Sequence, residues 1–126
     1  MARLTDITDP ELQAAVLEAE QALDAGDWLD SVRKSAAAYA KLAEKRPDAI
    51  VRAGPTVNDL PLGGRPENRG VARPWPNLFG VTLTWDGDRP SLVFDKQKFT
   101  MSEAVTYFEY TLDSALRAQR SPAPAA

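Results

Sequence analysis

The chain has 126 residues, of which 44% are hydrophobic and 26% charged, and its formal net charge is -3. This length suffices for one domain with its own core, and the acidic balance gives no support to binding of nucleic acid or an anionic membrane. The absence of cysteine and histidine excludes disulfides, thiolate nucleophiles, imidazole catalysis and metal sites built from these residues.

Two amphipathic helices are predicted in the first part of the chain. Asp9 and Pro10 form a helix start, because aspartate caps a helix N-terminus and proline suits the first helical position. Gly26 favours a tight break, and a second helix over about residues 28–46 then predicts an antiparallel helix hairpin. The predicted core stripes are Leu12, Val16, Ala19 and Leu23 in the first helix, and Leu29, Val32, Ala36, Tyr39 and Ala43 in the second.

Small residues in both helices, a Gly-Asp-Trp turn and a closing proline carry a family resemblance. These residues are Ala19, Ala22, Gly26, Asp27, Trp28, Ala38 and Pro47. In these features the hairpin, about residues 12 to 47, resembles a tetratricopeptide repeat, which implies a helix–turn–helix unit. The second helix is about one turn longer than in that repeat, and no second copy follows. We therefore interpret the segment as a generic helix hairpin.

The segment from Pro47 to Asn77 contains six prolines and four glycines and has the periodicity of neither a helix nor a strand. Connections of this length are usually binding loops or disordered segments. Arg65, Arg69 and Arg73 recur here at every fourth residue, and arginine binds phosphates and carboxylates through paired hydrogen bonds. Trp75 stands between two prolines, and we consider two roles for it: an exposed contact for a partner, or a plug that pins the segment to the body.

The last third of the chain predicts a β-hairpin and a helix. Residues 78–85 and 91–95 read as strands with turn residues between them, and their apolar face must lie on the helices or on a third strand. Thr100 and Glu103 form a capping box that begins the last helix, which runs to about Arg117. The predicted core stripe of this helix is Met101, Val105, Phe108, Leu112 and Ala115 or Leu116, flanked by Tyr107, Tyr110 and Thr111.

The fold class is therefore α+β: an N-terminal antiparallel helix hairpin, a long Pro/Gly/Arg loop, a β-hairpin, and a C-terminal helix packed on the first two. We expect residues 1–120 to form a single globular domain and residues 121–126 a mobile tail. No signal sequence or membrane span is predicted, so the expected location is cytoplasmic.

Any acid–base chemistry would fall to Asp, Glu, Tyr or Lys. For Glu103 we favour the capping role, and for Glu109 a solvated position opposite the core stripe. Asp86, Asp88 and Asp95 could supply oxygen ligands around the β-hairpin, but the spacing of Asp86 and Asp88 is that of an ordinary turn. We therefore assign no catalytic residue, no metal site and no cofactor.

These patterns favour a non-catalytic protein-interaction module: an adaptor, assembly factor or inhibitor of a partner protein. The alternative is a small-molecule or anion-binding protein, including a carboxylate or tyrosine enzyme, with a pocket between the 47–77 loop and the C-terminal helix. A third class, a structural component of an assembly, predicts a large apolar surface buried between copies. The candidate binding residues are Arg65, Arg69, Arg73, Trp75, Tyr107 and Glu103.

The expected partner is a protein or a second copy of the chain, with a small anionic ligand under the alternative, and neither nucleic acid nor membrane. For self-association, the candidate contacts are Leu17 and Leu42, which lie at the edges of the helical stripes.

Overall fold

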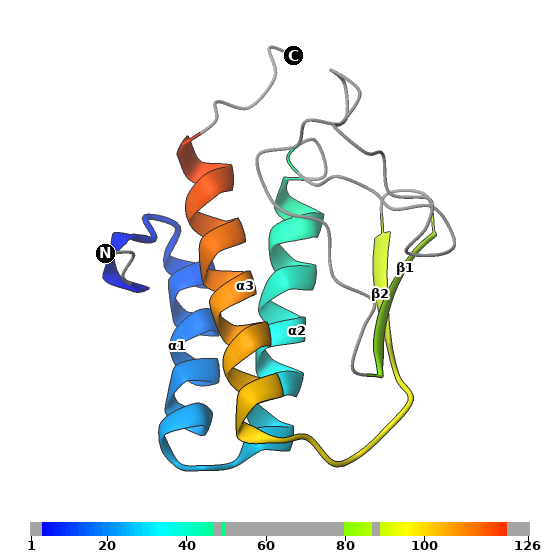
Figure 1. Cartoon of the computed structure of the whole chain (residues 1–126). Helices are drawn as coiled ribbons and strands as arrows, with labels where there is room; N and C mark the ends of the chain where they lie inside the picture. The colour runs from blue at the N-terminus through cyan, green and yellow to red at the C-terminus, as the bar shows by residue number, and fades with distance from the viewer. Residues whose placement is uncertain (1–3, 47–48, 50–79, 87–88, 121–126) are drawn as a thin grey trace, which may run out of the picture.

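The computed structural model describes residues 4–46, 49, 80–86 and 89–120 (Figure 1). Within these residues, the helices pack side by side and the strands lie next to α2 (Figure 1). The predicted α+β fold is confirmed, including the packing of the last helix on the first two. The elements in chain order are the 3-10 helix Leu4–Asp6, α1 Pro10–Asp24, α2 Trp28–Lys45, β1 Val81–Asp86, β2 Arg89–Phe94 and α3 Met101–Arg120.

The ends of the two helices in the α1–α2 hairpin are determined by contacts between residues that are close in the sequence. The Asp9 carboxylate accepts hydrogen bonds from the N–H groups of Glu11 and Leu12 at 2.9 and 3.2 Å and so caps α1. Gly26 has a φ of 77°, in the left-handed region that glycine enters without a steric penalty. Asp27 then caps α2 by accepting from the Asp30 N–H at 3.1 Å.

The α3 helix runs parallel to α2 and antiparallel to α1. Midway along the helices, the Thr111 hydroxyl donates to the Ser35 carbonyl at 3.1 Å. At their C-terminal ends, the Arg46 guanidinium donates to the Ala118 carbonyl at 3.0 Å. A cation suits this position because the last carbonyls of a helix carry partial negative charge. The strands between α2 and α3 therefore return the chain to the other end of the bundle, where α3 begins.

At the end of the bundle where α1 begins, its N-terminus is tied to the C-terminus of α2. Lys45 Nζ lies 3.1 Å from Asp9 Oδ2 and 3.2 Å from Glu11 Oε2. Burial acts to raise the pKa of Asp9, but the hydrogen bonds from Lys45 and from the N–H groups of Leu12 and Glu11 outweigh it and hold the pKa below its usual range.

The buried face of α3 differs from the predicted stripe. Met101 is 59% exposed, and Val105 and Leu112 are only partly buried. The buried positions are Ala104, Tyr107, Phe108, Thr111, Ser114, Ala115, Leu116 and Ala118. The prediction was right for Phe108, Ala115 and Leu116 and wrong for the other positions, because it followed apolar residues alone. The small residues of this face allow α3 to pack closely on α2. Tyr107, on the same helix, points toward the β-hairpin.

The predicted edge residues of the helical stripes behave differently from each other. Leu17 is 39% exposed, but Leu42 is 1% exposed and belongs to the hydrophobic core. Leu42 therefore has no surface to offer a second copy, and the prediction that it contacts one was wrong.

The β-hairpin is antiparallel, with Val81 opposite Phe94 and Asp86 opposite Arg89. The apolar side chains of one face, Leu92 and Phe94 among them, pack against the core cluster of the helices, as expected. Among the described residues no third strand joins the sheet.

The 47–77 loop, apart from Ala49, lies outside the described residues, as does the tail 121–126. Ala49 itself is buried in the core. None of the described helices is both long enough and apolar enough to span a membrane.

Candidate functional site

The capping box at the start of α3 is confirmed. The Thr100 N–H donates to Glu103 Oε1 at 2.9 Å, and the Glu103 N–H donates to Thr100 Oγ1 at 3.1 Å. These reciprocal bonds satisfy backbone donors that have no partner within the helix. One oxygen of the Glu103 carboxylate is thereby used by the helix itself.

The other carboxylate oxygen of Glu103 holds a lysine from the segment that leads out of the β-hairpin. Lys96 Nζ lies 2.8 Å from Glu103 Oε2 and 4.9 Å from the centre of the Phe99 ring, a distance typical of a cation–π contact. The hydrogen bond from Lys96, followed by that from the Thr100 N–H, holds the pKa of Glu103 below its usual range. We call Lys96, Phe99, Thr100 and Glu103 the α3 clasp.

A glycine at the start of β1 makes room for the α3 clasp. Gly80 has a φ of 83°, and a Cβ placed on it would lie 2.8 Å from Lys96 Cγ. Its carbonyl accepts from the Asp95 N–H at 2.7 Å. The lysine stem therefore crosses the end of the β-hairpin on its way to Glu103, and any larger residue at position 80 would push against it.

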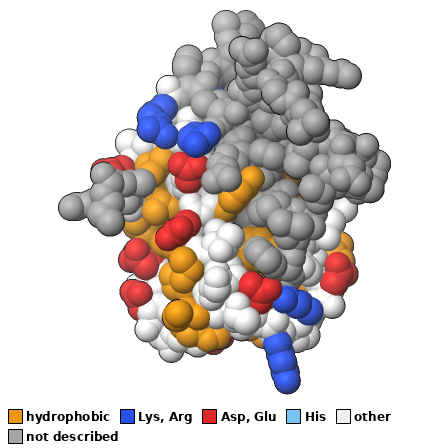
Figure 2. Space-filling view, in the orientation of Figure 1, with side chains coloured by type: hydrophobic (Ala, Val, Ile, Leu, Met, Phe, Trp, Pro, Cys, Tyr) orange, Lys and Arg blue, Asp and Glu red, His pale blue; other side chains and the backbone are white. Residues whose placement is uncertain are grey.

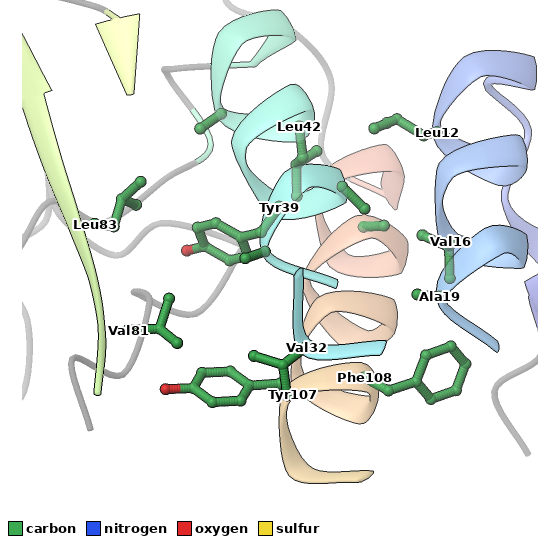
Figure 3. Packing of buried hydrophobic residues seen from close by; sticks show 14 of the residues in the cluster. Leu12, Val16, Ala19, Val32, Tyr39, Leu42, Val81, Leu83, Tyr107 and Phe108 are labelled. Atoms are coloured by element: carbon green, nitrogen blue, oxygen red, sulfur yellow. The ribbon is translucent and has the colours of Figure 1, made fainter. Parts of the chain in front are cut away.

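Tyr107, one turn after Glu103, is completely buried. In Figure 3 its ring points from α3 toward Val81 on β1, and Tyr39 extends from α2 toward the same strand. Burial raises the pKa of Tyr107 far above its usual range, and the negative charge of Glu103 adds to the rise, while a hydrogen bond with the backbone of Val81 acts in the opposite direction. Burial likewise raises the pKa of Tyr39. Both phenols therefore remain protonated and belong to the interior between the helices and the strands.

The structure brings together two of the six candidate binding residues. Glu103 and Tyr107 are neighbours on α3, and both connect α3 to the β-hairpin or to the segment that follows it. The other four candidates, Arg65, Arg69, Arg73 and Trp75, lie outside the described residues, as does the 47–77 side of the predicted pocket.

The remaining carboxylates are consistent with the roles favoured for them. Glu109 is exposed on α3, as expected for a solvated position. Asp86 and Asp95 are exposed on the β-hairpin, and Asp88 lies outside the described residues. No group of three or more acidic side chains within the described part of the chain is placed to hold a metal ion.

The α3 clasp was not predicted as a unit, although the capping box within it was. Lys96 and Gly80 gave the only available signals: a lysine seven residues before a capping glutamate, and a glycine at a strand start. These signals predict a contact only when the strand register is known, because the register places Gly80 beside Asp95 and hence beside Lys96.

No family model, curated protein or solved structure matches this chain. The likeness of the α1–α2 hairpin to a tetratricopeptide repeat therefore remains a resemblance of a few residues. The function has to be argued from the geometry of the chain itself.

Proposed function

We propose that this chain is a non-catalytic protein-interaction module that acts as an adaptor, assembly factor or inhibitor of a partner protein. The observation that carries the proposal is the use that the fold makes of Glu103 and Tyr107. These are the two candidate residues whose side chains are suited to acid–base chemistry. The first caps α3 and pairs with Lys96, and the second is buried against Val81. Both are engaged in holding the β-hairpin to the helices.

Recognition is then assigned to the arginines and the tryptophan of the 47–77 loop. Tryptophan and arginine dominate the binding energy of many protein interfaces because they combine large contact area with polar groups. Arg65, Arg69, Arg73 and Trp75 remain a prediction from the sequence in this role. A cytoplasmic setting is part of the same proposal.

A purely structural component is less well supported than an interaction module. Among the residues that the structure describes, the large hydrophobic side chains that are exposed are Leu17, Val93 and Met101, which lie on three different elements. Figure 2 shows hydrophobic side chains along α1 and α3 interrupted by acidic ones. A surface of this kind lacks the continuous apolar area of a permanent assembly interface.

The test is capture of a partner by the full chain and by two variants. Trp75→Ala removes the predicted anchor, whereas Met101→Ala removes a side chain that is 59% exposed on α3 and serves as the matched control. The proposal predicts a stoichiometric protein partner that is lost with Trp75→Ala and kept with Met101→Ala. Failure to capture any protein, together with tight binding of a metabolite that Arg69→Ala abolishes, would favour the small-molecule alternative.

A further inference from the structure

Within the described residues, the inner faces of the two strands of the β-hairpin differ in burial. The inward-facing Val81 and Leu83 of β1 are 0% and 9% exposed. Leu92 and Phe94 of β2 pack against the same core but are only partly buried. Within the described part of the chain the sheet contains only β1 and β2. Among the described residues, the inner face of β2 is therefore less completely covered than that of β1.

In β2, the backbone groups of every second residue point away from β1, toward the outer edge of the strand. The bond from the Asp95 N–H to the Gly80 carbonyl makes 80 and 95 a hydrogen-bonded pair. Pairs alternate along an antiparallel ladder, so positions 90, 92 and 94 are non-hydrogen-bonded pairs with β1. The N–H and C=O groups of Leu92 and Phe94 consequently point away from β1. A row of such groups is a template for another strand.

The segment at this edge has opposite charges at its two ends, so it is complementary to a second copy of itself that runs in the opposite direction. It reads RPSLVFD from Arg89 to Asp95. When two copies pair antiparallel about Leu92, Arg89 lies opposite Asp95 of the second copy, and Ser91 lies opposite Val93. Arg89 and Val93, the latter 47% exposed, occupy odd-numbered positions on the outer face of β2. Asp95 is the exposed residue that follows the strand, and its hydrogen bond to Gly80 continues the ladder by one position. Opposite charges would thus meet at both ends of the interface.

We propose that β2 binds β2 of a second copy of this chain, antiparallel and centred on Leu92, so that the two hairpins form one continuous sheet with twofold symmetry. A twofold interface uses the same patch on both copies, and this strand meets that requirement in its charges and in the outward N–H and C=O groups of Leu92 and Phe94, while Pro90, which has no N–H, contributes only its carbonyl. The surface is separate from the loop to which partner recognition is assigned, and it replaces the helical contact that the burial of Leu42 removes.

Sedimentation velocity of the full chain over a wide concentration range tests the interface. The wild type forms a dimer, and Asp95→Arg weakens dimerisation about tenfold or more, because arginine then faces arginine at both ends. Adding Arg89→Asp to Asp95→Arg restores the opposite charges and the dimer. The matched control Thr84→Arg adds an arginine to the exposed outer face of β1, which does not lie at the interface, and keeps the dimer.

Two results of this experiment would overturn the proposal. The first is a wild type that remains monomeric at every concentration, which would show that β2 does not bind a second copy of the chain. The second is a dimer indifferent to Asp95→Arg in a variant that folds normally by circular dichroism, which would place the interface elsewhere on the chain.

Cysteine cross-linking tests the register even if a charge variant fails to fold. The chain has no cysteine of its own, so introduced thiols report without background. A mixture of Ser91→Cys and Val93→Cys copies forms disulfide-linked dimers under mild oxidation, whereas either variant alone forms far fewer, because each position lies opposite the other and not opposite its own counterpart. Equal cross-linking by the separate variants, or none in the mixture, contradicts the register.

Discussion

Replacing Tyr107 with phenylalanine removes one oxygen atom from the contact between α3 and β1 and leaves the buried ring in place. The side chain is completely buried, and its hydroxyl bonds with the backbone of Val81. The variant leaves a buried backbone group without its partner, which typically costs about 1–3 kcal/mol of unfolding free energy. For a chain of this length that corresponds to a fall in melting temperature of roughly 4–12 °C.

Urea denaturation of the wild type and of Tyr107→Phe measures this loss, and hydrogen exchange locates it. We expect amide protection to fall in β1 and to be kept in the α1–α2 hairpin. Glu109→Gln is the control, because Glu109 lies on the same helix and is exposed, so the substitution removes no buried group. A Tyr107→Phe variant with unchanged stability and unchanged protection of β1 would refute a structural role for the hydroxyl.

Three further predictions concern single positions. Ser114→Ala should raise the unfolding free energy in urea by about 1 kcal/mol, since the buried Ser114 hydroxyl has no hydrogen-bond partner and alanine is the better helix former; a loss of stability would contradict this. Gly80→Ala should lower it by roughly 1–2 kcal/mol because of the positive φ, and by more where its Cβ meets the Lys96 stem, so the loss should be smaller when Gly80→Ala is made in a Lys96→Ala background; an equal loss in both backgrounds would show that the lysine stem moves aside without cost. Since the pKa of Glu103 is lowered in the folded state, its stabilisation is complete above the ordinary carboxylate pKa and is lost as the pH falls through the folded-state pKa. The melting temperature should therefore drop more steeply between about pH 5 and pH 3 in the wild type than in Glu103→Gln, and equal slopes would exclude this contribution.

The features predicted correctly from the sequence are those fixed by a few neighbouring residues. The N-caps at Asp9 and Asp27, the turn at Gly26 and the capping box at Thr100 each act within one helical turn. Such signals determine where helices begin and end, and those boundaries determine the fold class.

The buried face of α3 could not be predicted in the same way. Ala104, Thr111 and Ser114 carry little or no apolar signal, yet they lie on the buried face of α3, whereas the apolar Met101 is exposed. Periodicity reports which residues prefer the interior, but the partner helix decides which face is covered.

The candidate site was predicted only in part, for a related reason. Glu103 and Tyr107 are neighbours by helical spacing alone, but what each of them contacts depends on where the β-hairpin docks. That position depends on strand register and on Lys96, which approaches Glu103 across the end of the hairpin. Such contacts between separate elements are not encoded in any local pattern.

The affinity of the captured partner for three forms of the chain tests the central claim most directly. Isothermal calorimetry at a temperature where all three forms are folded compares the wild type, Tyr107→Phe and Trp75→Ala. The proposed function predicts that Tyr107→Phe keeps the wild-type Kd within about twofold, whereas loss of a hot-spot tryptophan weakens it by roughly thirtyfold or more. A Kd that rises sharply with Tyr107→Phe and is unchanged by Trp75→Ala would place recognition at the contact between α3 and β1 and contradict the account.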